Sequence, residues 1–218
     1  MDRKSKAASP ELISDSDERA RREVANGFRQ FDAVLEMVEQ HRAERRPFKL
    51  RLSAILTLHR FALEGISSFA GNFRPSTVEI GGSSHTPVGA HLVPGLVEEM
   101  CDYVNEHWET ATPLHLAAYV MWRINWIHPF DDGNGRTSRA VSYLVLCMKL
   151  GDRLPGTRTI PDQIATNKTP YYRALEAADA ALRTRNKVDV SALEGLLEEM
   201  LAAQLLTVVE KASGSTRG

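Results

Sequence analysis

Apolar residues recur every three or four positions along most of the chain, and this spacing is typical of amphipathic helices. Between Val24 and Val38 the apolar positions alternate in this way with charged residues on the opposite face. The pattern returns on both sides of a polar, glycine-containing stretch at residues 128–139. It predicts helices over residues 19–42, 50–66, 93–107, 113–127, 136–150, 160–166 and 191–210, with a further helix opening at Thr169-Pro170.

Glycine and proline interrupt the helical pattern between residues 71 and 90. Within this segment Val78, Glu79 and Ile80 belong to a β-prone alternation, so we expect a short β-hairpin or flap there. Residues 1–18 are predicted to form a flexible N-terminal tail because they are mostly polar. Residues 211–218 follow the last predicted helix and should form a flexible C-terminal tail. Residues 19–210 should then form a single all-α domain, long enough to bury a core.

Composition gives no sign of a nucleic-acid or membrane partner. Charged residues make up 25% of the 218 residues and the net charge is −1, so no field of one sign favours nucleic acid or a membrane surface. Cys101 and Cys147 lie in apolar patterns without metal-ligand spacing, which indicates buried thiols in a reducing compartment. We find no signal peptide, and no apolar run approaches the roughly 18 residues of a membrane span. These features predict a cytoplasmic protein.

The stretch from His128 to Arg139 combines the groups that nucleotide chemistry requires. Its sequence, HPFDDGNGRTSR, lies between two apolar helical patterns and therefore forms a tight loop between two core helices. The residues after the glycines form the first turn of the second helix, whose unpaired N–H groups favour an anion. Arg136 and Arg139 can add bidentate phosphate contacts. Asp132 can share Mg²⁺ with phosphate oxygens, and His128 supplies a base with an ordinary pKa near ~6.5.

Each of these features is more often structural when it occurs alone. A histidine before a proline is usually a core or capped residue, and Gly-Asn-Gly is usually a turn. The ordered combination between two apolar helices reverses this balance and favours a functional loop.

The stretch resembles the signature of Fic-domain proteins, His-x-Phe-x-Asp/Glu-Gly-Asn-Gly-Arg-x-x-Arg, and matches every fixed position. The similarity extends to Phe61–Arg74, to the segment at residues 78–80 and to Tyr171–Leu175, and it covers roughly residues 20 to 210. The resemblance implies a Fic-type helical bundle with a small β-hairpin flap. The corresponding flap in the family aligns the target's hydroxyl segment by adding a strand.

The resemblance also implies an activity, the transfer of AMP from ATP to a Ser, Thr or Tyr hydroxyl of a target protein with release of pyrophosphate. His128 would be the base and Asp132 would hold Mg²⁺ or Mn²⁺. The helix beginning near Thr169 would lie beside the adenine. The residues implied to bind the nucleotide are Gly133, Asn134, Gly135, Arg136, Arg139, Tyr172 and Asp179.

Several alternatives remain open at this point. The same fold supports transfer of UMP or phosphocholine, removal of AMP, or phosphorylation, although the phosphorylating relatives carry Ala and Lys where this chain has Gly133 and Gly135. A nucleotide-sensing interaction module without catalysis is a further alternative, but it has no need of the base His128. The target, the base preference and the oligomeric state, including a homodimer, are not specified by the sequence. Some relatives are also injected into host cells.

Many relatives carry an inhibitory helix, Ser/Thr-x-x-x-Glu-Gly/Asn, whose Glu pairs with the arginine at the position of Arg139. Glu64-Gly65 and Glu194-Gly195 end in the right way but lack the Ser or Thr four residues before the Glu. Glu23 lies on the N-terminal helix near the expected place without the motif. We therefore expect restraint to be looser, absent or supplied by a separate antitoxin-like partner. Replacing Glu23 should change activity by about twofold at most.

Overall fold

The computed structural model describes residues 5–6, 12–44 and 46–212, and the secondary structure of this part of the chain is almost entirely helical. The all-α class is confirmed, with one small β element. The elements are β1 (Ser5–Lys6), α1 (Ser16–Glu44), α2 (Leu52–Leu63), β2 (Glu79–Ile80), η1 (Ala90–Leu92), α3 (Val93–Glu106), α4 (Pro113–Ile127), α5 (Asn134–Leu150), α6 (Ile160–Thr166), α7 (Lys168–Arg185) and α8 (Ser191–Ala212).

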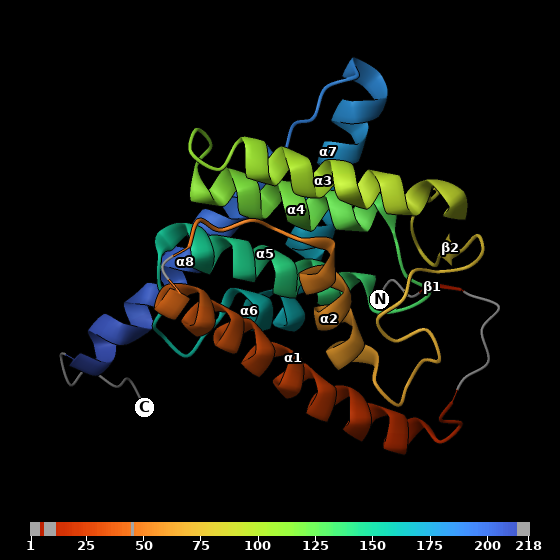
Figure 1. The fold of residues 1–218 in the computed structure, drawn as a ribbon, viewed down its shortest axis with the longest axis horizontal. Coiled ribbons are helices and arrows are strands. Elements are labelled where there is room, and N and C mark those ends of the chain that lie inside the picture. The colour runs from red at the N-terminus through yellow and green to blue at the C-terminus, as the bar shows by residue number, and fades with distance from the viewer. Residues whose placement is uncertain (1–4, 7–11, 45, 213–218) are drawn as a thin grey trace.

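Helices α4 and α5 form the centre of the bundle (Figure 1). α4 and the part of α5 after Arg139 are mostly apolar and buried, and Trp122, Met121 and Val145 have no exposed surface. A helix that is apolar all round must be covered on every side. Here α3, α7 and α8 pack against α4, while α1, α2 and α6 pack against α5. The loop between α4 and α5 is thereby held between the two most extensively covered helices of the bundle.

Sequence signals explain where these helices begin and end. The Thr112 side chain accepts a hydrogen bond from the backbone N–H of His115, and Pro113 follows at the first helical position. Gly151 ends α5 with φ +82°, a left-handed conformation that glycine adopts without a Cβ penalty. The predicted cap at Thr169 was wrong. Asn167 caps α7, accepting from the N–H of Thr169, because an Asn side chain reaches the N–H two residues ahead.

The β element differs from the predicted hairpin. β2 does not pair within residues 71–90 but with the N-terminal β1, in an antiparallel register of Ser5 with Ile80 and Lys6 with Glu79. Ile80 is followed by glycine at residues 81 and 82, and Gly82 has φ +72°, so the chain turns away before a second strand can form. The predicted N-terminal tail therefore contains a strand, and α1 begins inside it, at Ser16. The rest of that tail at 1–4 and 7–11, and the C-terminal residues 213–218, lie outside the described residues.

Cys101 and Cys147 are buried free cysteines and do not form a disulfide with each other. Burial raises the pKa of Cys101 to about 12 and that of Cys147 to about 11. Such thiols are inert packing groups. Within the described residues, no helix has the length and apolarity that crossing a membrane requires.

Candidate active site

A cavity of about 550 Å³ opens beside the α4–α5 loop. This volume is within the range of small-molecule sites. Its walls come from the N-terminal end of α1, from the two β-strands, from the α4–α5 loop and from α7. Its basic and acidic lining residues are Arg19, Arg136, Arg139, Lys168, Glu23, Asp132 and Asp179. All of the predicted catalytic, metal and nucleotide-binding residues line this cavity.

His128 terminates α4 and its imidazole lies in the cavity wall. The residue has φ +53°, a conformation that is rare for a non-glycine residue and is held here by hydrogen bonds. The Nδ1 atom lies 3.4 Å from the carbonyl oxygen of Asn125, which can only accept, so the ring proton sits on Nδ1. The Nε2 atom is then an acceptor, and the Ser5 hydroxyl donates to it at 2.8 Å. Burial lowers the pKa of His128 to about 4, so the ring is neutral at pH 7.

The loop after His128 is closed by its own side chains. The Asn134 side chain accepts from the Phe130 N–H and donates to the Phe130 carbonyl, both at 2.9 Å. The Asp131 carboxylate accepts from the Asp132 N–H at 2.9 Å and from the Ser67 hydroxyl at 3.2 Å. The side chain of Asn134 is thus turned into the loop. Any nucleotide contact by this residue would have to come from its backbone N–H or from the edge of its amide.

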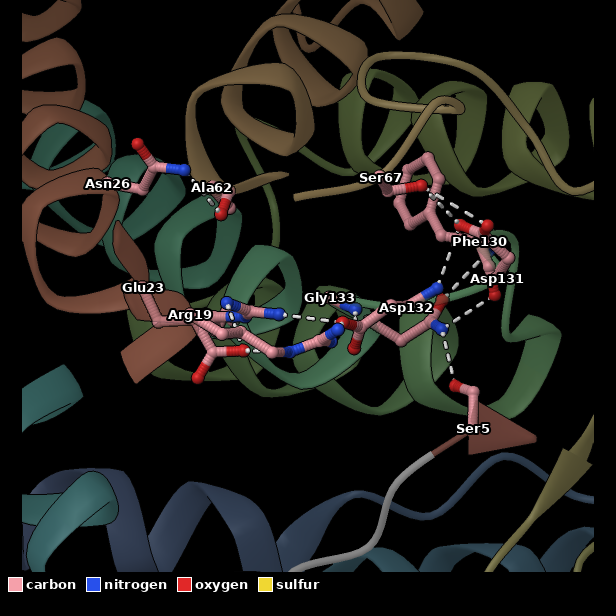
Figure 2. A network of polar contacts seen from close by, with 12 residues as sticks. Ser5, Arg19, Glu23, Asn26, Ala62, Ser67, Phe130, Asp131, Asp132 and Gly133 are labelled. Carbon is pink, nitrogen blue, oxygen red and sulfur yellow. Dashed lines mark hydrogen bonds and ion pairs between the residues drawn. The ribbon is translucent and has the colours of Figure 1, made fainter. Parts of the chain in front are cut away.

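Asp132 faces the cavity within a network of ion pairs (Figure 2). Its Oδ2 atom accepts from Arg19 and from Arg136, each at 3.1 Å, and its Oδ1 atom accepts from the Gly133 N–H at 2.6 Å. Glu23 lies 3.3 Å from Arg19 Nε and 3.7 Å from one nitrogen of Arg136. That nitrogen of Arg136 is buried and makes no hydrogen bond. Glu23 therefore approaches the first arginine of the motif.

The second arginine, Arg139, lies one turn further along α5 and lines the cavity beside Gly135. A Cβ at Gly135 would lie 3.3 Å from its guanidinium, so glycine leaves room for the arginine to fold over the first turn. Gly133 has φ +77°, and a Cβ there would lie 2.3 Å from the buried Leu63. Glycine at position 133 lets the loop pack tightly against α2, and glycine at position 135 keeps the first turn of α5 free of a Cβ beside Arg139.

The wall supplied by α7 contains the remaining two predicted nucleotide-binding residues. Tyr172 and Asp179 both line the cavity, and Asp179 accepts a hydrogen bond from the Trp122 indole at 2.8 Å. The neighbouring Tyr171 is buried and its hydroxyl bonds to Asn125 and Ser138, which ties α7 to both central helices. Both tyrosines border the cavity, but the Tyr171 hydroxyl is used in packing the helices together.

The predicted flap residues have three different environments. Val78 is buried at 7% exposure, Glu79 is exposed, and Ile80 lines the cavity next to β1. Only the last of them can contact a molecule in the cavity through its side chain.

Two further residues position the loop, and the sequence patterns gave no functional reason to choose them. His59 stacks on Phe130 with ring centroids 3.7 Å apart, accepts from the Gly71 N–H, and donates to the Asp132 carbonyl at 3.1 Å. Arg74 is buried at 2% exposure and donates to the carbonyls of His128, Ser76 and Val88. A guanidinium satisfied by carbonyls alone fixes backbone geometry at His128 and in the flap loop.

The sequence patterns also did not identify Arg19 as a residue of the site. It lies on α1, whose helical pattern was predicted, but its contact with Asp132 spans more than a hundred residues. The spacing of Arg19 and Glu23 places both on one face of α1, which is the only local signal that they act together.

Part of the chain is similar to a known protein family. Residues 49–146 match the family model described as Fic/DOC family. A curated relative, "Protein adenylyltransferase Fic" of Drosophila persimilis, is 35% identical over 133 residues, which are 60% of this chain and 24% of the relative. The chain therefore spans about a quarter of the length of the curated relatives it matches.

Solved structures share the fold. Fic-1 from C. elegans superposes with a TM-score of 0.68 at 21% identity, covering 94% of this chain and 55% of the other. BepC from Bartonella tribocorum, solved with bound AMPPNP, has a TM-score of 0.52 at 14% identity and covers 86% and 88% of the two chains. At these identities the likeness establishes the fold alone.

Proposed function

Because residues 49–146 match the Fic/DOC family model, we propose that this chain is a protein adenylyltransferase, which transfers AMP from ATP to a protein hydroxyl. The observation that carries the proposal is the arrangement of the cavity. A neutral imidazole nitrogen of His128 and the anion-binding first turn of α5 face the same space. The curated relatives are named for this activity, and a structural neighbour was solved with AMPPNP.

The reaction needs a base, a phosphate grip and a place for the nucleoside. His128 Nε2, freed to accept by the Nδ1–Asn125 contact, would take the proton of the attacking hydroxyl. The oxygen would then bond to the α-phosphorus while the bond to the β-phosphate breaks and pyrophosphate leaves. The N–H groups of Asn134 and Gly135, in the first turn of α5, would hold the phosphate oxygens as charge develops, while the Gly133 N–H orients Asp132. Arg136 and Arg139 would bind the outer phosphates, and Tyr172 and Asp179 would flank the adenosine.

The residues of this site fit a divalent cation that is shared with the substrate. Asp132 presents a carboxylate that is 35% exposed to the cavity. Across the described residues, no group of three or more His, Cys, Asp or Glu side chains forms a metal site. One carboxylate with phosphate oxygens and water is the usual environment of Mg²⁺. Asp132 would hold the ion, which would neutralise charge on the phosphates, and Arg19 would have to yield part of that carboxylate.

The direct test uses ATP labelled at either the α- or the γ-phosphate, incubated with the purified chain and a cell lysate. We expect protein-bound label from the α-position only, with release of pyrophosphate. Retention of γ-label on protein would establish phosphorylation instead. Competition by unlabelled UTP or CTP measures the base preference. The cytoplasmic location, an antitoxin-like inhibitor and a homodimer stay predictions.

A second prediction concerns restraint by α1. Arg139→Ala should lower transfer about 10- to 100-fold, because a charge-assisted contact to phosphate is worth about 1.5–3 kcal/mol. Among the described residues Glu23 forms ion pairs with Arg19 and Arg136 but not with Arg139, and its side chain is 39% exposed. Glu23→Gly should therefore change activity by about twofold at most. Turnover by purified variants measures both effects.

The control for this pair of variants is Glu23→Gln, which keeps helix propensity and removes only the charge. A rise of about tenfold or more in either Glu23 variant would mean that this carboxylate restrains the enzyme through Arg136, and the expectation of an unrestrained chain would be wrong.

A third prediction concerns pH. The base must be unprotonated, and burial lowers the pKa of His128 to about 4, so the active form predominates above that pH. The acidic limb of kcat/KM, which reports the free enzyme, should lie near pH 4 rather than near the ordinary value of about 6.5. Bound phosphates favour the protonated ring, so the limb of kcat should lie at higher pH. Coincident limbs near 6.5 would contradict this assignment.

A further inference from the structure

The N-terminal strand lies where the hydroxyl of a protein substrate would have to lie. From this geometry we infer that Ser5 is an acceptor for the chain's own transfer reaction, so that the protein modifies itself at this residue. This inference rests on the proposed function and names one substrate of it. It is carried by two independent sets of contacts, one from the Ser5 side chain and one from the backbone of β1.

The side-chain contacts place the Ser5 oxygen on the base. Its Oγ lies 2.8 Å from His128 Nε2, the nitrogen that the Asn125 contact leaves without a proton. A general base must be within about 2.6–3.2 Å of the group it deprotonates. Asn134 Nδ2 lies 3.5 Å from the same oxygen, on the side of the anion-binding turn. Figure 2 shows Ser5 directed toward the loop that also carries Asp132 and Gly133.

The backbone contacts explain why Ser5 lies there. β1 pairs with β2 in an antiparallel register that sets Ser5 opposite Ile80. Pairing of this kind binds an extended segment through main-chain hydrogen bonds and leaves alternate side chains to point at the site. Ser5 and Ile80 both line the cavity, so the strand register brings the hydroxyl to its wall. The flap therefore already holds an acceptor segment from the same chain.

The proposed step balances without any reagent beyond ATP. The Ser5 oxygen loses its proton to His128 Nε2 and forms a bond to the α-phosphorus. The bond between that phosphorus and the bridging oxygen of the β-phosphate breaks, and pyrophosphate carries away the electron pair. The product is a phosphodiester that joins Ser5 to AMP, and His128 returns its proton to solvent.

Because acceptor and base belong to one chain, the reaction should be intramolecular. Only residues 6–15 separate Ser5 from the start of α1, which itself borders the cavity. A tethered group acts at a high effective concentration and does not depend on encounter between molecules. The fraction modified per unit time should therefore be independent of protein concentration.

The test is incubation of the purified 218-residue chain with Mg²⁺ and ATP, followed by intact-mass measurement and fragmentation to locate the adduct. We expect one AMP on Ser5 and a rate constant that does not change when the protein is diluted about tenfold. Ser5→Ala should reduce labelling to the level of His128→Ala, and Ser5→Thr should retain it. Ser14→Ala, at an exposed position between the strand and α1, is the matched control and should label like the wild type.

The possible results separate this inference from the proposed function. Label on lysate proteins but none on Ser5 would overturn the inference and leave the function standing. Full labelling of Ser5→Ala at another residue would do the same. A rate constant that falls in proportion to dilution would show transfer between molecules and overturn the intramolecular assignment. No transfer to any acceptor and no release of pyrophosphate would overturn the proposed function itself.

Discussion

His128→Ala should lose transfer activity by about 10²–10⁴-fold, the range that a positioned general base contributes. The expectation follows from the ring geometry, in which Nδ1 is held by Asn125 and Nε2 accepts a hydroxyl proton at 2.8 Å. His85 is the other histidine among the described residues that line the cavity, and its Nε2 atom bonds to the Trp126 carbonyl rather than to a hydroxyl. Turnover with saturating ATP measures the effect.

Nucleotide affinity separates a lost base from a damaged fold. The phosphate contacts come from α5 and do not involve the imidazole, so His128→Ala should bind ATP with a Kd within a few-fold of the wild type. His91→Ala is the matched control, because His91 is exposed and does not line the cavity. Equal turnover by His128→Ala and the wild type would remove this residue from the mechanism.

Much of the fold could be predicted because helices carry local signals. The spacing of apolar residues located the helices, and Thr112, Gly151 and Ile160 marked boundaries that the structure shares. The motif loop was also predictable, because its glycines, arginines and histidine lie within twelve consecutive positions between two apolar helices. These residues meet at one cavity through the packing of α4 against α5 and α7, and their convergence needs no pairing with more distant segments.

The parts that could not be predicted depend on contacts between distant segments. β2 has only two residues, and its partner β1 lies more than seventy positions earlier, so no alternation or turn signal links them. Arg74 resembles a surface residue in sequence, but its buried guanidinium satisfies three backbone carbonyls. His59 fits the helical pattern of α2 as a packing residue, and only the fold shows that it stacks on Phe130 and holds the Asp132 carbonyl.

The second large effect is expected at Asp132. Asp132→Ala should lower turnover by about 10²-fold or more and weaken the dependence of turnover on divalent cation. A bound cation that stabilises the charge on the phosphates lowers the barrier by several kcal/mol, and the variant would lose the carboxylate that holds this cation. The carboxylate also accepts the Gly133 N–H at 2.6 Å and pairs with Arg19 and Arg136, so the alanine variant can disturb the loop. Asp132→Asn separates the two roles, since its amide oxygen still accepts from Gly133 while the charge is removed.

The neighbouring carboxylate supplies the matched control. Asp131 is buried at 4% exposure and bonds to Ser67 and to the Asp132 N–H, so it closes the loop without facing the cavity. Asp131→Asn should lower the temperature of unfolding and leave the half-saturating Mg²⁺ concentration unchanged. Asp132→Asn should do the opposite, raising that concentration with little change in unfolding temperature. Wild-type activity in excess EDTA, or equal Mg²⁺ dependence in both variants, would exclude Asp132 as the residue that holds the cation.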